Sequence, residues 1–122
     1  MSKIRCVSVD DDRLILSIIE GMVSEFPELD LVGEFYNSVD ATTGITKHKP
    51  DLVFLDIMMP GLNGLEVLDV LDIAPYVIVI SGKSEIRDEV LAHPMVIDFL
   101  DKPIQLDDFA AAVKKAENIM NS

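Results

Sequence analysis

Short apolar runs alternate along this chain with segments of helical periodicity, and this alternation constrains the fold most. Strands are predicted at Ile4–Val9, Leu29–Tyr36, Leu52–Asp56, Val77–Ser81 and Val96–Leu100. Helices are predicted at Arg13–Glu25, Val39–His48, Asn63 to about Leu71, Glu85–Ala92 and Leu106–Met120. Strands that are apolar at successive positions are typical of parallel sheets covered by helices on both faces. Since crossovers are right-handed, we expect one α/β domain over residues 1–122, with a doubly wound five-stranded parallel sheet and five helices.

The pattern also predicts which side chains face the core. In the first helix the inward residues are predicted to be Leu14, Ile15, Ile18, Ile19, Met22 and Val23. In the last helix they are predicted to be Phe109, Val113, Ala116 and Met120. The second strand differs from the others, because Asp30, Glu34 and Tyr36 alternate with apolar residues as on a sheet edge.

Charged and polar residues stand where the predicted strands end. They are Asp10, Asp11, Asp56, Ser81 and Lys102. Neighbouring strands lie only about 5 Å apart, and ligands of open parallel sheets bind at the carboxyl ends of the strands. We therefore expect three carboxylates and one ammonium to share a crevice.

Clustered carboxylates need a chemical partner. Two like charges about 4 Å apart repel by roughly 4 kcal/mol at an effective dielectric near 20, so the group either holds a proton or binds a cation. A few carboxylates with water suit Mg²⁺. Zinc is disfavoured, because His48 and His93 are the only histidines, lie far apart in the sequence and are expected at the surface.

A carboxylate in such a pocket can attack phosphorus and form an aspartyl phosphate. Lys102 and Ser81 can then supply donors to the phosphoryl oxygens, since phosphoryl transfer depends mainly on positioning and electrostatics. Asp12 is expected only to cap the first helix.

Composition excludes other classes of function. With 10 basic and 22 acidic residues the formal charge is −12, which disfavours direct nucleic-acid binding. An apolar run such as Tyr76–Ile80 is far too short to span a membrane, and the polar residues 10–13 interrupt any signal peptide. Cys6 is the only cysteine, so it is expected to be a buried structural thiol in a cytoplasmic protein.

The chain resembles the receiver domain of two-component response regulators. The resemblance covers nearly the whole chain and rests on the segments Val9-Asp10-Asp11-Asp12, Leu55-Asp56-Ile57-Met58-Met59-Pro60-Gly61-Leu62-Asn63-Gly64, Ile80-Ser81-Gly82 and Phe99-Leu100-Asp101-Lys102-Pro103. It implies the flavodoxin-like strand order 2-1-3-4-5.

The resemblance also implies a role for each motif residue. Asp56 matches the phosphoacceptor. Asp10 and Asp11 match the acidic pair that binds Mg²⁺ (with Mn²⁺ as a substitute in vitro), Asp11 directly and Asp10 largely through water. The backbone carbonyl of Met58 matches a further metal ligand, and Lys102 matches the lysine that pairs with a phosphoryl oxygen.

The resemblance extends to the switch that transmits phosphorylation. Ser81 matches the hydroxyl that turns toward the phosphoryl group, and Phe99 matches the aromatic residue whose burial follows it. Pro103 matches a proline that typically follows a cis peptide bond. Together they imply a shift of population that repacks the surface of the fourth helix, fifth strand and fifth helix.

Some positions depart from the commonest family pattern. Phe99 lacks the hydroxyl of the frequent tyrosine. Met58 and Lys83 match variable positions that tune dephosphorylation, and an apolar Met58 cannot orient an attacking water, so we expect a long-lived phosphoryl group. Pro94 stands where the family often has glycine-alanine, which predicts a short or irregular fourth helix.

The implied phosphodonor is a histidine kinase or a histidine phosphotransfer protein, and homodimerisation through the face of the fourth helix, fifth strand and fifth helix is one implied contact. Catalysis is expected only of the chain's own phosphorylation and dephosphorylation. A receiver-like interaction module that works without phosphorylation stays open. So does a Mg²⁺-dependent phosphatase, although such enzymes commonly have an aspartate where this chain has Met58. Both a stand-alone receiver and part of a longer protein fit the chain.

Overall fold

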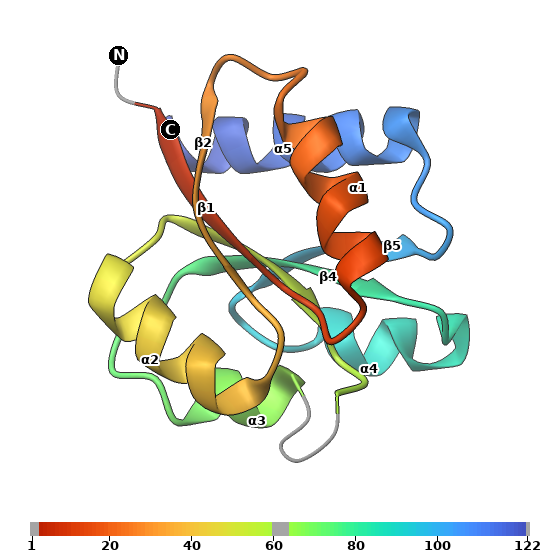
Figure 1. Ribbon diagram of the computed structural model, residues 1–122. Helices are drawn as coiled ribbons and strands as arrows, with labels where there is room; N and C mark the ends of the chain where they lie inside the picture. The colour runs from red at the N-terminus through yellow and green to blue at the C-terminus, as the bar shows by residue number, and fades with distance from the viewer. Residues whose placement is uncertain (1–2, 60–63, 122) are drawn as a thin grey trace.

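The computed structural model describes residues 3–59 and 64–121, and the described strands form one parallel sheet (Figure 1). The strands are β1 (Ile4–Val9), β2 (Leu29–Phe35), β3 (Leu52–Asp56), β4 (Tyr76–Ser81) and β5 (Val96–Asp101). Their order is β2-β1-β3-β4-β5, which confirms the predicted doubly wound fold. The helices are α1 (Arg13–Val23), α2 (Ser38–His48), α3 (Gly64–Asp69), the 3₁₀ helix η1 (Ser84–Ile86), α4 (Arg87–Leu91) and α5 (Leu106–Met120).

Helices cover both faces of the sheet and enclose two cores. Figure 1 shows α1 and α5 on one face and α2, α3 and α4 on the other. Successive strand residues serve opposite cores, so Cys6 packs with α1 and α5 whereas Val7 packs with α2 and α4. This two-sided burial is why the central strands have no polar alternation.

The two edge strands are irregular, and the central ones are not. The register of β2 against β1 shifts between Cys6 and Val7, and that of β5 against β4 shifts between Val77 and Ile78. Bulges of this kind are common at sheet edges, where they discourage pairing with another chain. The edge position predicted for β2 is confirmed.

The predicted inner face of α1 is wrong in part. Leu14 and Ile18 are 67% and 38% exposed, whereas Leu16, Ile19 and Val23 are buried. These three are spaced three and four residues apart and make one stripe, while Leu14 and Ile18 each lie about 160° from Leu16 around the helix. The six predicted residues covered too wide an arc for one face. In α5, Phe109, Val113 and Ala116 are buried and Met120 packs against the same core, as predicted.

Local capping follows the predictions where the structure describes it. The Asp12 carboxylate accepts a hydrogen bond from the amide of Leu14 at 2.9 Å and caps α1. The fourth helix is short, as Pro94 predicted, and follows a turn of 3₁₀ helix. The predicted cap Asn63 lies outside the described residues. None of the described helices is long and apolar enough to cross a bilayer.

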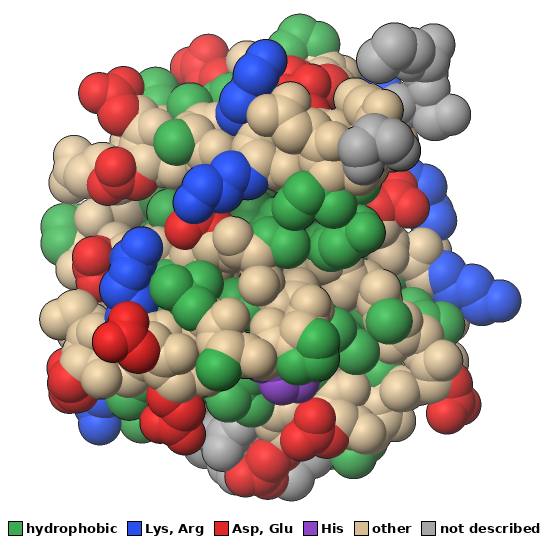
Figure 2. Space-filling model, turned by 180° about the vertical axis from the view of Figure 1, so that it is seen from behind, with side chains coloured by type: hydrophobic (Ala, Val, Ile, Leu, Met, Phe, Trp, Pro, Cys, Tyr) green, Lys and Arg blue, Asp and Glu red, His purple; other side chains and the backbone are tan. Residues whose placement is uncertain are grey.

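The surface matches the acidic composition. Figure 2 shows acidic side chains around the face seen from behind, basic ones dispersed among them, and hydrophobic side chains gathered near its middle. The visible basic side chains form no continuous stripe on this face, unlike the surface of a protein that binds a phosphate backbone.

Candidate functional site

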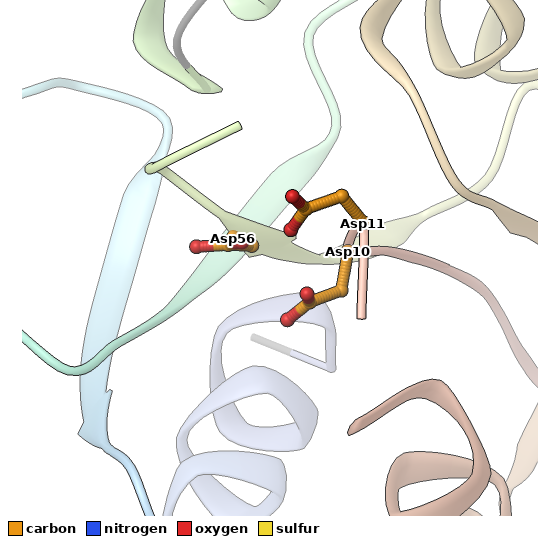
Figure 3. A group of neighbouring side chains, drawn as sticks. All are labelled: Asp10, Asp11 and Asp56. Carbon is orange, nitrogen blue, oxygen red and sulfur yellow. The ribbon is translucent and has the colours of Figure 1, made fainter. Parts of the chain in front are cut away.

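Three carboxylates meet at the carboxyl end of the sheet. Asp10 and Asp11 follow β1, Asp56 ends β3, and these strands are neighbours with Val9 opposite Leu55. One carboxylate oxygen from each of the three aspartates lies within 4.8 Å of the others (Figure 3). Asp10 and Asp56 are buried, whereas Asp11 is exposed at the rim. The sheet topology therefore brings together the three carboxylates that were predicted to lie close to one another.

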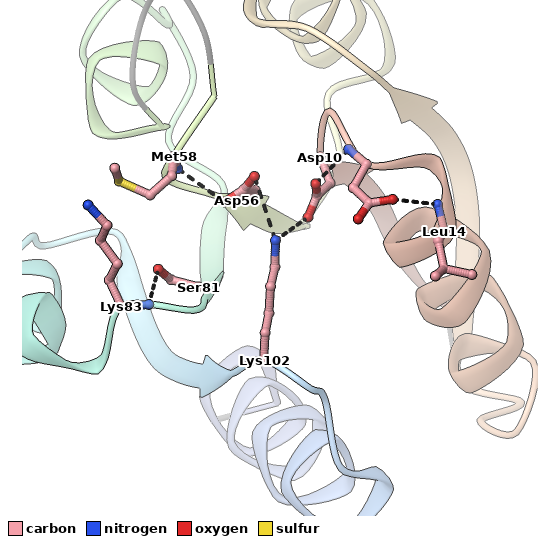
Figure 4. A network of polar contacts seen from close by, with 8 residues as sticks. Asp10, Leu14, Asp56, Met58, Ser81, Lys83 and Lys102 are labelled. Carbon is pink, nitrogen blue, oxygen red and sulfur yellow. Dashed lines mark hydrogen bonds and ion pairs between the residues drawn. The ribbon is translucent and has the colours of Figure 1, made fainter.

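Backbone amides fix one oxygen of each buried carboxylate. Asp10 Oδ1 accepts from the amide of Asp12 at 2.9 Å, and Asp56 Oδ1 accepts from the amide of Met58 at 3.0 Å. The Oδ2 atoms face Lys102, whose Nζ lies 3.0 Å from Asp10 and 3.8 Å from Asp56 (Figure 4). Lys102 thus bridges the two buried carboxylates, as its place after β5 predicted.

Negative charge is in excess at the site. The pKa of Asp56 is raised from 3.8 to about 6, chiefly by burial; the charges of Asp10 and Asp11 contribute to the rise, and the Met58 amide and the Lys102 ammonium oppose it. One ammonium therefore does not compensate three carboxylates. This imbalance is what a bound cation would correct.

The donor set suits a hard divalent ion. Asp10 Oδ2 is fully buried and, apart from its ion pair with Lys102, accepts no hydrogen bond from the described residues. Carboxylate oxygens beside an exposed rim, open to water, match the coordination that Mg²⁺ prefers. Among the described residues this trio is the one group of three or more acidic, histidine or cysteine side chains placed to hold an ion.

Ser81 ends β4, as predicted, and Phe99 lies within β5. Ser81 is fully buried, and its Oγ accepts from the amide of Lys83 at 3.1 Å (Figure 4). Phe99 is only 2% exposed and packs in the core under α2, α3 and α4. The ring is thus already buried while the Ser81 hydroxyl is engaged with its own loop. Coupled movement of the two residues stays a prediction.

Met58 and Pro103 complete the motif. The Met58 side chain is 48% exposed at the rim of the site, and its amide is engaged with Asp56. Metal binding by its carbonyl stays a prediction. The peptide bond from Lys102 to Pro103 is cis.

Sequence reasoning missed Arg87. Its Nη1 donates to the carbonyl of Phe99 at 3.3 Å, and its guanidinium carbon lies 5.6 Å from the centre of the Phe99 ring. No spacing rule joins these residues, because they belong to different elements and their contact depends on the angle at which α4 meets β5.

The three carboxylates lie away from a cavity at the other end of the sheet. This cavity of about 770 Å³ is lined by residues that include Ile4, Asp51 and Tyr76 at the starts of β1, β3 and β4. The carboxylates instead lie at the carboxyl edge, where Asp11 and Met58 are exposed. An exposed rim is open to a group presented by another macromolecule.

The fold and the acidic site are those of a doubly wound α/β domain, and comparison with known proteins gives its family. The family model for the response regulator receiver domain matches residues 6–114. The chain therefore belongs to the response regulator receiver family, whose members act in two-component signalling. Receiver domains are signalling domains and are generally not enzymes.

Relatives agree with this assignment. An uncharacterised response regulatory protein from Shewanella oneidensis is 31% identical over 92% of this chain and 48% of its own length. The transcriptional regulatory protein BtsR of Escherichia coli K12 is 32% identical over 83% of this chain and 43% of its own length. The chain thus spans about half the length of the curated relatives it matches.

Solved structures agree on the fold. The response regulator domain of Thermotoga maritima CheB superposes with a TM-score of 0.82 at 29% identity, covering 98% of each chain. The receiver domain of a NarL-type response regulator from Mycobacterium tuberculosis gives a TM-score of 0.83 at 26% identity, covering 96% of this chain and 98% of that one.

Proposed function

We propose that this chain is a phosphorylation switch in which Asp56 accepts a phosphoryl group in the presence of Mg²⁺. The observation that supports it most is the placement of a buried carboxylate, Asp56, between two further carboxylates and one ammonium. The proposed donor is the phosphohistidine of a histidine kinase or a phosphotransfer protein, because the rim of the site at Asp11 and Met58 is exposed to a side chain on another protein.

The proposed reaction is a single displacement at phosphorus. An Asp56 carboxylate oxygen forms the new O–P bond as the P–N bond of phosphohistidine breaks, and the imidazole leaves with the electron pair. Asp56 must be ionised to attack, and with a pKa of about 6 it is mostly ionised at pH 7. Lys102 already lies beside Asp56, where its ammonium can pair with an incoming phosphoryl oxygen.

The metal would be held by Asp10, Asp11 and Asp56, with the carbonyl of Met58 as a further ligand. When bound, Mg²⁺ offsets the negative charge of the phosphoryl oxygens and of the carboxylates. Until then, the Lys102 ammonium and the Met58 amide are the described groups that oppose the negative charge of Asp56. We therefore expect bound metal to favour phosphorylation, and phosphorylation to raise the affinity for the metal.

The proposed output is a change of surface on the α4, β5 and α5 side. A phosphoryl group adds roughly −1.5 to −2 charge and new acceptor oxygens near Ser81. The Ser81 hydroxyl would then exchange its bond with the Lys83 amide for one with the phosphoryl group, and Phe99 would repack. Contacts with partners, including a second copy of the chain, would respond to that repacking.

The proposal does not extend to the activities named for the longer relatives. The names of relatives mention transcriptional regulation and glutamate methylesterase activity, but those proteins are more than twice as long as the stretch that matches. The proposed location is the cytosol, in keeping with Cys6, a buried free thiol whose pKa burial raises to about 12.

Intact mass after incubation with Mg²⁺ and acetyl phosphate tests the proposal. We expect a mass gain of one phosphoryl group in the wild type and none in Asp56→Asn or without Mg²⁺. Lack of any gain with several phosphodonors would favour a module that works without phosphorylation. Sustained turnover of small phosphate esters would favour a phosphatase instead.

A further inference from the structure

Arg87, the first residue of α4, contacts Phe99 in two ways. Its Nη1 donates to the Phe99 carbonyl at 3.3 Å, and its guanidinium carbon lies over the ring at 5.6 Å from the centroid. Phe99 is almost fully buried, whereas Arg87 is exposed. The guanidinium therefore covers the outside of a buried ring and also holds the main chain of the same residue.

Phe99 lies in an edge strand, and side chains occupy both of its main-chain groups. Its amide donates to Asp98 Oδ1 at 2.8 Å, and its carbonyl accepts from Arg87. Groups on an edge strand otherwise lack a strand partner. Asp98 Oδ2 in turn lies 3.2 Å from Lys115 of α5. A polar path thus crosses the open edge from α4 to α5 through Phe99.

α4 is otherwise fixed by apolar packing, since Val90 lies in the core and Leu91 packs against it. The helix itself is short. It has five residues, no side-chain cap at its start and one buried residue, Val90. A helix this short is not stable alone and depends on its tertiary contacts. The two contacts of Arg87 therefore add to the packing of Val90 and Leu91 in fixing α4 on β5.

The same short segment carries Ser81. Two residues separate Ser81 from η1, and η1 leads directly into Arg87. A change at the Ser81 hydroxyl, now bonded to the Lys83 amide, would act on the chain that presents Arg87 to Phe99. Both switch residues are therefore connected to α4 through Arg87. Ser81 is connected along the chain, and Phe99 is connected by its contact with the Arg87 side chain.

We infer that Arg87 is a positioning residue that couples the state of Phe99 to the position of α4. The inference rests on the proposed switch at Asp56 and names the contact that would carry its output. We attribute the role to the shape of the guanidinium rather than to its charge. A guanidinium can donate to the carbonyl and lie flat on the ring at the same time, which an ammonium cannot. Arg87→Lys should therefore behave like Arg87→Met.

Amide hydrogen exchange on the whole chain tests this, read at Ala92 and His93, whose amides bond to the carbonyls of Asp88 and Val90. We expect exchange about tenfold faster in Arg87→Met than in wild type, because the variant loses one charge-assisted hydrogen bond. Lys115→Met is the matched control, since it removes an exposed lysine at the other end of the path. Its α4 amides should exchange as in wild type.

The second readout is the response to beryllium fluoride, a phosphoryl mimic, with Mg²⁺. Wild type should change its exchange at Ala92 and His93, and Arg87→Met should lose most of that response while still taking up phosphoryl from acetyl phosphate. Unchanged α4 exchange in the free Arg87 variants would overturn the inference. So would faster exchange with the full response kept, because Arg87 would then only stabilise the helix.

Failure of the proposed function is distinguishable from failure of this inference. If wild type takes up no phosphoryl group, the proposed function fails and the coupling role fails with it, while exchange in the free variants still measures the α4 contact. If uptake is normal, the two exchange readouts alone decide. Should Arg87→Met not fold, Arg87→Lys gives the same comparison.

Discussion

The two ends of the sheet handle charge in opposite ways. At the amino end, Arg5 donates from its guanidinium to the carbonyl of His48 at 2.7 Å, and its amide donates to the Asp51 carboxylate at 3.0 Å. At the carboxyl end, two buried carboxylates and an exposed one share the single ammonium of Lys102. Donors and acceptors are matched at the first end and left unbalanced at the second.

The difference shows where the chain favours stability and where it favours function. A balanced end gains little from any ligand. At the unbalanced end, a bound cation would reduce the repulsion between the carboxylates, so cation binding there is favourable. Removing a carboxylate at the unbalanced end should therefore stabilise the free protein, whereas removing a charged side chain at the balanced end should destabilise it.

The largest expected effect is that of Lys102→Met. Removing one partner of a buried ion pair typically costs about 3 kcal/mol or more, and Lys102 serves two buried carboxylates. We expect a loss of about 3 kcal/mol in the free energy of unfolding at pH 7, measured in urea without metal. Mg²⁺ should restore part of it by replacing the lost positive charge.

Lys115→Met is the control for that loss. The Lys115 side chain is 55% exposed and its ammonium pairs with one carboxylate, so its removal should cost less than about 1 kcal/mol. Equal losses in the two variants would mean that the carboxyl end is not electrostatically special.

Asp56→Asn should instead increase the free energy of unfolding of the metal-free protein. The pKa of Asp56 is about 6 in the folded chain and ordinarily 3.8. Between these pH values the unfolded chain releases the proton while the folded chain keeps it, so wild-type stability falls as pH rises through the window. Since one pKa unit corresponds to about 1.4 kcal/mol, we expect a gain of about 1 to 3 kcal/mol at pH 7.

The pH dependence checks this sign. In urea titrations without metal, the stability difference between Asp56→Asn and wild type should be small near pH 4 and grow until about pH 6. Added Mg²⁺ should stabilise wild type more than the variant. A variant less stable than wild type at pH 7 would show that Asp56 is a structural carboxylate.

At the balanced end, Arg5→Met should destabilise. The guanidinium lies near two carbonyls at the end of α2, and losing it leaves them to water because the site is exposed. We expect a loss of about 1 kcal/mol at pH 7. Phosphoryl uptake should be unaffected, as measured by intact mass. Reduced uptake would mean that the two ends of the sheet are coupled.

Sequence reasoning located the unbalanced end because topology dictates it. Once the strands are parallel, residues at their carboxyl ends must meet, so Asp10, Asp56 and Lys102 followed from the apolar runs alone. The balanced end was not predicted. Its partners lie on a helix end and a loop, and nothing in the spacing of Arg5 and His48 indicates their contact.

Side-chain directions were the other limit. Periodicity predicted that α1 has an apolar face but not where its centre lies, so Leu14 and Ile18 were placed inward although both are exposed. Ser81 was placed correctly at a strand end, but its bond to the Lys83 amide depends on a rotamer that spacing does not determine. The roles of the site residues stay predictions until phosphorylation is measured.

The smallest expected effect concerns Met58, at the rim of the unbalanced end. Its side chain is 48% exposed while its amide bonds to Asp56, so the side chain starts next to the proposed phosphoryl group and reaches toward solvent. A thioether orients attacking water poorly, whereas a carboxamide both donates and accepts hydrogen bonds. We expect Met58→Gln to speed hydrolysis of the phosphorylated chain about threefold, a barrier change of about 0.6 kcal/mol.

Decay of the phosphorylated mass after removal of acetyl phosphate measures that rate. Met58→Leu is the control, since it keeps an apolar side chain of similar size and should decay as wild type does. If Met58→Gln decays at an unchanged or slower rate, water positioning at this residue does not limit hydrolysis. The lifetime would then be set by the charged groups around Asp56, which makes Lys102 the residue to vary next.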